Sequence, residues 1–246
     1  MPNRIVSFFI LCFLSTQLFA QEKTKKVYRP DIPGSFLIDF GFNSGLSKPQ
    51  GFTQGFWGSR TLNIYYHYPV RIGDTKFTYN PGGGFSFERF KFTNNYTLVL
   101  QPDGTYILQD PTSLLQASTI KKSMLVANYF DLMPVEFRFD TNPKDISRSL
   151  SVSIGARVGF LIESHTKINY TTNGVSETLK NKQNNGLNTF RYGLYGRVGM
   201  GNFNFFGFYN ISPYFATNKG PLNNTTTDLN HTTMNTMTIG ISINGF

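Results

Sequence analysis

Charged side chains recur within segments that otherwise alternate between apolar and small residues. Arg157 lies between Ala156 and Val158, and Arg191 has apolar neighbours in the same way. Because successive residues of a β-strand point to opposite faces, the charged residues would share one face and the apolar residues the other. The charged positions predicted to share a polar face are Asp39, Glu88, Glu136, Arg138, Arg157, Arg191 and Arg197.

Side chains of both signs on one enclosed face could do two kinds of chemistry. An isolated charge in a low-dielectric interior costs far more than a paired one, so enclosed charges must pair. Paired charges would form a polar plug that fixes the register of the strands. A hydrated arrangement would instead line a narrow pore. The mixture of signs favours the plug, and the pore stays open as the alternative.

Residues for catalysis or metal binding do not gather in the sequence. Ser164 and His165 form the only adjacent serine–histidine pair, and adjacency alone is no evidence of a catalytic triad. His67 and His231 fall in other segments, so a zinc site would require an accident of loop folding. We therefore predict no enzymatic activity, no catalytic or metal-binding residues and no cofactor.

The elements that must carry the charged residues are strands. The clearest segment runs from Leu150 to Ile162, with apolar residues at every second position. The last segment alternates in the same way, with its isoleucines facing away from Thr238 and Ser242. Alternation marks eight segments: 36–42, 62–70, one from about 77 to 88, one ending at 135–139, 150–162, 190–200, 203–215 and 236–243.

Short and long connections alternate between these segments. The short turns are 71–76, 141–147 and 201–202, and the longer polar loops are 43–60, 93–122, 164–187 and 216–231. Strict alternation of loop length with an even number of strands is typical of barrels in the bacterial outer membrane. Aromatic residues make up 16% of the chain and charged residues only 15%, which suits a wall between lipid and a polar lumen. We predict an all-β, closed, antiparallel up-and-down transmembrane β-barrel of eight strands, a multi-pass protein of the cell outer membrane.

The two ends of the chain favour the same location. Residues 1–20 have a basic start, an apolar stretch and a polar close, the pattern of a secretory signal peptide. The single cysteine, Cys12, would leave with this segment, so no disulfide is predicted. Residues 21–33 would form a periplasmic lead-in and residues 34–246 the barrel. Phe246 would be the signal that the barrel assembly machinery reads on the last strand.

Two charged residues break the alternation. In an unbroken register Arg89 and Asp131 would face lipid, so we expect bulges near 87–90 and near Pro134, or strands that protrude beyond the bilayer. The third loop carries a turn sequence at 102–104 between two apolar runs, which predicts a hairpin of its own. This hairpin, and the segment 203–215 that fits either register, leave a ten-stranded barrel as an alternative.

Some stretches of the sequence are similar to one known family. They include Tyr28-Arg29-Pro30-Asp31-Ile32-Pro33-Gly34, Leu132-Met133-Pro134-Val135-Glu136-Phe137-Arg138-Phe139 and the ending Gly240-Ile241-Ser242-Ile243-Asn244. In these stretches the chain resembles the PorT-like outer-membrane β-barrels of Bacteroidota-type bacteria. The resemblance implies the same barrel fold. Some relatives are accessories of the type IX secretion system and gliding machinery, so it also implies a structural or accessory role in envelope protein export, with a secretion-system protein as partner.

Basic residues exceed acidic ones and give a formal net charge of +9. Four of them fall in the predicted lead-in, and lysines in the outer loops could attract the phosphates of lipopolysaccharide: Lys121, Lys122, Lys180 and Lys182. Ordinary solvated loop charge is the other interpretation. Secretion argues against nucleic acid as a partner, and outer-membrane lipid is the expected surrounding.

A soluble, lipocalin-like ligand-binding barrel is the competing interpretation, because its strands also alternate. In that fold the apolar face would point inward. The placement of aromatic residues distinguishes the two, since several lie near the short turns: Tyr66, Tyr68, Phe137, Phe139 and Phe203. Such residues form a girdle at a membrane interface, and a lipocalin gives no reason for the ring.

Overall fold

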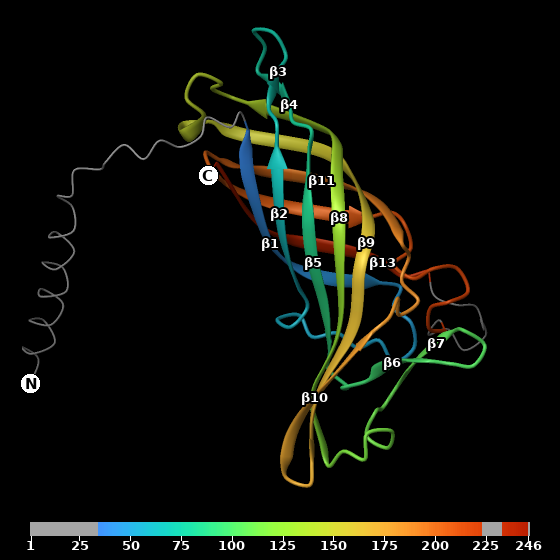
Figure 1. The fold of residues 1–246 in the computed structure, drawn as a ribbon. Helices are drawn as coiled ribbons and strands as arrows, with labels where there is room; N and C mark the ends of the chain where they lie inside the picture. The colour runs from blue at the N-terminus through green and yellow to red at the C-terminus, as the bar shows by residue number, and fades with distance from the viewer. Residues whose placement is uncertain (1–33, 223–232, 246) are drawn as a thin grey trace, which may run out of the picture. The chain divides into compact units, whose positions relative to one another are not determined.

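The computed structural model describes residues 34–222 and 233–245 and consists almost entirely of strands (Figure 1). Within these residues eight strands form a barrel: β1 (Ser35–Leu46), β2 (Arg60–His67), β5 (Gly82–Phe92), β8 (Thr119–Asp140), β9 (Leu150–Thr172), β11 (Phe190–Met200), β12 (Phe203–Asn210) and β13 (Asn235–Asn244). The remaining elements are β3 (Val70–Arg71), β4 (Phe77–Tyr79), β6 (Thr97–Leu100), β7 (Tyr106–Gln109), the 3-10 helix η1 (Ile146–Arg148) and β10 (Val175–Lys182). No helix among the described residues is long and apolar enough to cross a membrane.

Several sequence predictions fall outside the described residues. These are the signal peptide at 1–20, the lead-in at 21–33 with its basic residues, His231 and the assembly signal Phe246. The boundaries at residues 20 and 33 therefore stay predictions.

Antiparallel pairing closes the sheet on itself. Each barrel strand pairs with the next one along the chain, and β1 pairs with β13, where Phe40 lies opposite Ile241. The short turns lie at one end of the barrel, the short-turn end, together with β3 and β4 (Figure 1). The long loops lie at the other, the long-loop end, where β8 and β9 run on and β10 pairs with β9. The predicted eight strands are confirmed, and the predicted third-loop hairpin, β6–β7, forms a separate two-stranded sheet.

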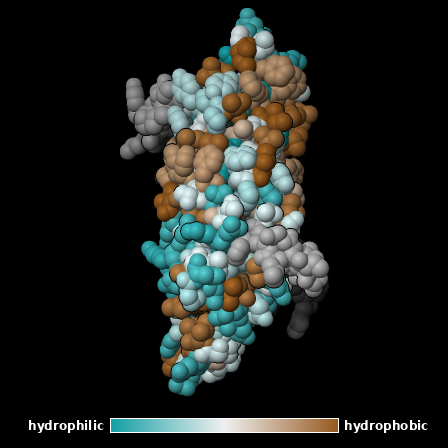
Figure 2. Space-filling model, turned by 90° about the vertical axis from the view of Figure 1, so that its right-hand side faces the viewer, coloured by the Kyte–Doolittle hydropathy of each residue, from teal (hydrophilic) through white to brown (hydrophobic). Residues whose placement is uncertain are grey.

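Alternate residues separate the wall from the lumen. On β13, Met237 and Ile239 face outward with exposed fractions of 38% and 49%, whereas Thr236 and Thr238 are buried on the lumen side. On the face drawn in Figure 2, hydrophobic side chains gather mainly in the upper half and hydrophilic ones mainly in the lower half, towards the long loops. The lipocalin-like alternative is wrong, because the apolar face of the strands points outward.

Aromatic side chains form two rows on the outer wall. Near the short-turn end, the ring centroids of Phe36 and Tyr66 lie 5.4 Å apart, and those of Phe77 and Phe139 lie 5.3 Å apart. Strand register places a second row nearer the long loops, consisting of Phe85, Phe130, Phe160 and Phe190. Aromatic girdles of this kind border the apolar band of outer-membrane barrels on both sides. The predicted girdle near the short turns is present.

A bulge in β8 brings Asp131 into the lumen. The pairing of β8 with β9 shifts between Leu132 and Val135, so that one extra residue is accommodated at Pro134. Proline has no N–H to donate to the ladder, which makes it suited to such a site. Asp131 and Glu136 would face opposite sides of a regular strand, yet both are buried inside. The predicted bulge near Pro134 is therefore confirmed.

The second predicted bulge is absent from β5. Arg89 pairs in regular register with Arg60 on β2 and Val126 on β8, and it faces outward like Phe85 and Phe87. The expectation that a bulge near 87–90 would turn it inward is wrong. Arg89 instead lies on the outer wall towards the long-loop end, beyond the second aromatic row.

Two strands differ most from those that the alternation predicted. The segment 150–162 continues as β9 to Thr172 and turns back as β10, so much of the predicted loop at 164–187 is a hairpin. The segment 203–215 is a strand only as far as Asn210, with Phe206 and Phe208 directed into the lumen. Polar composition had indicated a loop in the first case, although antiparallel pairing also satisfies the backbone of a polar, exposed hairpin.

Candidate functional site in the barrel lumen

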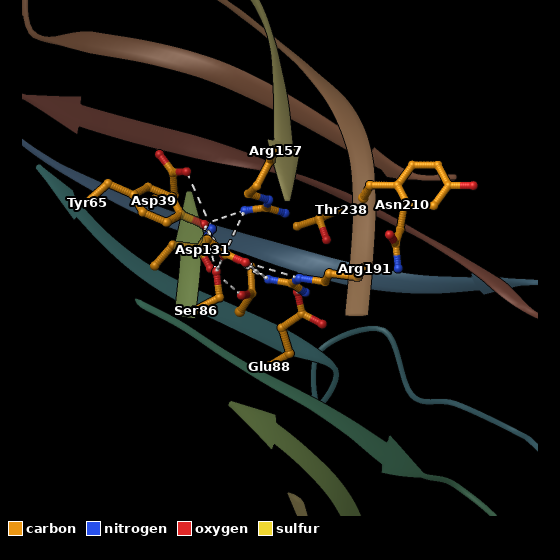
Figure 3. A network of polar contacts seen from close by, with 12 residues as sticks. Asp39, Tyr65, Ser86, Glu88, Asp131, Arg157, Arg191, Asn210 and Thr238 are labelled. Atoms are coloured by element: carbon orange, nitrogen blue, oxygen red, sulfur yellow. Dashed lines mark hydrogen bonds and ion pairs between the residues drawn. The ribbon is translucent and has the colours of Figure 1, made fainter. Parts of the chain in front are cut away.

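Asp131 is the centre of a buried charged cluster in the lumen (Figure 3). Its side chain has no exposed surface. Its Oδ2 lies 2.8 Å from Nη2 of Arg191 and accepts a hydrogen bond of 2.9 Å from the hydroxyl of Tyr65. The hydroxyl of Ser86 also donates to it, and Nη1 of Arg157 lies 3.8 Å away. We call these residues, with Glu88, the Asp131 cluster.

The two arginines of the Asp131 cluster are held by both charge and aromatic rings. Nη1 of Arg191 lies 2.5 Å from Glu88, and its guanidinium group lies 3.7 Å from the centroid of the Tyr129 ring. The guanidinium group of Arg157 lies 3.4 Å from the centroid of Phe208 and donates a hydrogen bond to Tyr65. Two carboxylates thus face two guanidinium groups, so the cluster is electrically balanced, which is the condition for burying charge at tolerable cost.

A second cluster lies further along β8, towards the short-turn end. Arg197 contacts Glu136 at 2.6 Å and Asp39 at 3.3 Å. Glu136 also accepts hydrogen bonds from the hydroxyl of Tyr195 at 2.8 Å and from the amide of Asn80 at 3.0 Å. Nδ1 of His67 lies 3.9 Å from the same carboxylate. We call Asp39, Glu136 and Arg197 with these three partners the Glu136 cluster.

Arg138 is not part of either cluster. It makes a two-pronged contact with Asp140, with distances of 2.9 to 3.1 Å, near the short-turn end. Both residues line a cavity of about 390 Å³ at that mouth, together with His67 and Asn80. Of the charged residues predicted to face the lumen, Glu88, Arg157 and Arg191 therefore belong to the Asp131 cluster. Asp39, Glu136 and Arg197 belong to the Glu136 cluster. Arg138 instead pairs with Asp140, which the sequence did not indicate as a partner.

Glycines on the lumen face make room for the large side chains. A Cβ atom added to Gly159 would lie 2.7 Å from Nε of Arg191, and one added to Gly155 would lie 2.5 Å from the ring of Tyr195. Contacts this close do not occur between real atoms, so any other residue would displace these partners. The two glycines are thus required by the clusters themselves.

An aromatic cap fills the lumen at the long-loop end. It consists of Phe52, Phe90, Phe92, Leu98, Tyr106, Leu125, Ala127, Tyr129, Leu187, Tyr214, Phe215 and Met234, all buried. Strands supply part of it and loops the rest, as in the contact between Phe92 of β5 and Phe52 of the first loop, whose ring centroids lie 5.1 Å apart. Phe90 likewise packs against Tyr214, with centroids 5.3 Å apart.

The adjacent residues Ser164 and His165 do not point toward each other. Ser164 accepts a hydrogen bond from Asn185 at 2.8 Å, whereas His165 contacts Glu163 at 3.2 Å on the opposite face of β9. Among the described residues no group of three or more His, Cys, Asp or Glu side chains could hold a metal ion. What the clusters can do is satisfy buried charge, fix strand register and occupy space that water would otherwise fill.

The set of charged residues predicted to face the lumen did not include Asp131, and nothing in the sequence indicated its partners Tyr65 and Ser86. Tyr65 and Ser86 do follow the alternation of their strands, but an uncharged residue on the lumen face carries no sign of its partner. For Asp131 the sequence did give a signal, because Pro134 predicted a bulge in the strand, but that signal did not say which residues Asp131 would contact.

An antiparallel barrel with an apolar outer band and a charged, filled lumen is the architecture of an integral outer-membrane protein. The chain belongs to the family described as outer membrane protein beta-barrel domain, whose model matches residues 19–219. It is accordingly a protein of the outer membrane.

The chain is similar, at low sequence identity, to solved structures of other outer-membrane proteins. The attachment invasion locus protein Ail of Yersinia pestis is 14% identical, with a TM-score of 0.34, over 87% of this chain and 99% of that one. Neisserial surface protein A is 11% identical, with a TM-score of 0.35, over 87% of this chain and 97% of that one. No curated protein matches the chain at a significant level.

Removing one partner of a buried pair should cost far more than removing an exposed carboxylate. We expect Glu136→Ala to lower the free energy of unfolding by about 3–5 kcal/mol, because it leaves Arg197 buried with only part of its counter-charge. The control is Glu177→Ala on the exposed strand β10, where a change within about 0.5 kcal/mol is expected. Urea unfolding of the two variants in detergent or lipid measures both values. Equal stability of the two variants would show that the ion pair between Glu136 and Arg197 does not stabilise the barrel.

Proposed function

We propose that this protein is a sealed outer-membrane barrel with a structural or accessory role and no enzymatic activity. The observation that supports it is the filling of the lumen along β8. Leu125, Ala127 and Tyr129 belong to the aromatic cap, Asp131 to the central cluster and Glu136 to the next, and residues of the short-turn end line the cavity at Asp140. An eight-stranded barrel is just wide enough for side chains, so this filling leaves no water column between the two ends.

The pore alternative requires mobile water beside the charges, and the pairing of those charges speaks against it. Each arginine in the Asp131 and Glu136 clusters contacts a carboxylate or a tyrosine hydroxyl and lies against an aromatic ring. In a conducting lumen these arginines would have to leave the carboxylates and tyrosine hydroxyls that they contact. Release would expose buried charge at a cost of several kcal/mol per ion.

The role in envelope protein export, of the type IX secretion or gliding kind, rests on the resemblance to PorT-like barrels. The stretch from Leu132 to Phe139 that carries much of that resemblance is also the part of β8 that forms the bulge and places Glu136. In this role the barrel would be a scaffold in the membrane, assembled by the barrel assembly machinery. A protein of the secretion system would bind its loops or its short-turn end, and lipopolysaccharide would be its lipid partner.

Conductance tests the sealed lumen. In planar bilayers the purified barrel should show little steady current, because ion pairs and the aromatic cap occupy the path. The paired substitution Glu88→Ala with Arg191→Ala removes two large side chains without changing net charge, and it should raise the current. A large, stable ohmic conductance in the parent protein would refute the plug and establish the pore.

Capture from the membrane tests the export role. A tagged barrel, purified from detergent-solubilised outer membranes, should retain a defined secretion-system protein after washing. An unrelated barrel of similar size, tagged in the same way, serves as the control. If the two barrels retain the same proteins, the accessory role in export is wrong, while the sealed lumen is unaffected.

A further inference from the structure

Five cations gather on the outer wall towards the long-loop end. They are Arg60 of β2, Arg89 and Lys91 of β5, Lys122 of β8 and Lys167 of β9, and we call them the outer basic patch. Strand register brings them together. Arg60 pairs with Arg89, and Met124 of β8 lies between Lys91 of β5 and Lys167 of β9. The patch thus crosses four neighbouring strands.

The outer basic patch has no counter-charge within the described part of the chain. None of its members forms a salt bridge there, and Nε of both Arg60 and Arg89 is buried without a hydrogen-bond partner. Two like charges directly opposite each other on paired strands destabilise a sheet. A buried donor without a partner adds a further cost. An anion lying between the two guanidinium groups would remove both costs.

The neighbouring charged groups are already engaged. The carboxylate of Glu163 lies within 3.2 to 3.6 Å of His165, Lys180 and Lys182. The carboxylate of Glu88 is held on the lumen side by Arg191. Of the loop lysines that the sequence offered for lipopolysaccharide, Lys180 and Lys182 therefore have an internal partner, whereas Lys122 belongs to the outer basic patch.

The apolar band of the barrel begins directly beside the patch. A groove of about 360 Å³ contains three of the cations and is lined on its apolar side by Phe40, Leu62, Phe87, Met124 and Val126. Leu62 and Phe87 are exposed on the outer face, one alternation step from Arg60 and Arg89. Positive charge and apolar surface thus meet in one groove, which matches a molecule with an anionic head and apolar chains.

An aromatic group next to the patch marks the same level of the membrane. Phe42 pairs with Arg60 across β1 and β2. Its ring stacks on Phe56 at 4.7 Å and contacts Trp57 at 5.5 Å, and Trp57, the single tryptophan, is 76% exposed. Tryptophan is enriched where head groups meet acyl chains. The cations therefore lie at head-group depth, on the side of the long loops.

We propose that the outer basic patch binds the phosphates of a phosphorylated glycolipid in the outer leaflet, with acyl chains of that lipid along the groove. Arginine presents several donors in a fork that matches phosphate, and the lysines add point charges around it. A soluble acidic partner would not account for Leu62 and Phe87 beside the charges. The inference deepens the proposed lipid partner and does not depend on the sealed lumen, which conductance tests separately.

Lipid binding by the purified full-length barrel tests this site. The probe is bisphosphorylated lipid A in detergent micelles, followed by native mass spectrometry. The comparison probes are the same lipid without its phosphates and inorganic phosphate alone. The variant Arg60→Gln, Arg89→Gln, Lys167→Gln should bind the phosphorylated lipid at least about tenfold more weakly than the parent. The control variant Arg71→Gln, Lys76→Gln, Lys144→Gln removes the same charge from exposed positions at the short-turn end and should bind like the parent. Faster gel migration without boiling shows that each variant is folded.

Three results would overturn the proposal. Equal binding of the phosphorylated and dephosphorylated lipids by the parent would mean that the outer basic patch does not bind the phosphate groups. Equal loss in both triple variants would mean that net charge alone attracts the lipid. If inorganic phosphate binds as tightly as the lipid, the apolar part of the groove is not used, and the lipid assignment is wrong. Should the patch variant fail to fold, Arg89→Gln alone is compared with Lys76→Gln in the same assay.

Discussion

A single buried carboxylate ties together strands from more than half of the barrel. Asp131 on β8 contacts Tyr65 on β2, Ser86 on β5, Arg157 on β9 and Arg191 on β11. An eight-stranded barrel has little room for water, so charge inside it must be satisfied by other side chains. Once Asp131 is buried, its partners are constrained in turn: Arg191 requires Glu88, and the glycine at 159 is needed to admit its side chain.

The irregularity of β8 makes this arrangement possible. Without the bulge at Pro134, Asp131 and Glu136 would lie on opposite faces, and one of them would have to enter the lipid. The bulge gives each carboxylate its own set of partners on the same side of the wall. Bulges are found in barrels where a side chain has to be redirected, and here the redirected group is a charge. The cost of interrupting the ladder is therefore offset by pairing inside the lumen.

Much of the wall could be predicted from the sequence, because a strand links the direction of a side chain to its position in the alternation. The inward positions of Asp39, Glu88 and Arg191 follow from that rule alone. The partner of each charged residue could not be predicted, because the alternation shows which side of the wall a residue faces but not its level along the barrel axis. Arg138 faces inward as expected, yet it lies at the level of Asp140 and beyond the reach of Asp131. The aromatic cap was missed because seven of its twelve residues lie in the connections between barrel strands, and local sequence does not say where a connection packs.

A double-mutant cycle measures whether Asp131 and Arg191 are energetically coupled, as a pair that organises the lumen must be. Asp131→Asn and Arg191→Met keep the approximate size of each side chain while removing its charge. The free energy of unfolding is measured for the parent, the two single variants and the double variant. The double variant should be more stable than the sum of the single losses implies, with a coupling of about 1.5 kcal/mol or more. Losses that add to within about 0.5 kcal/mol would show that the two residues act independently and would contradict the claim.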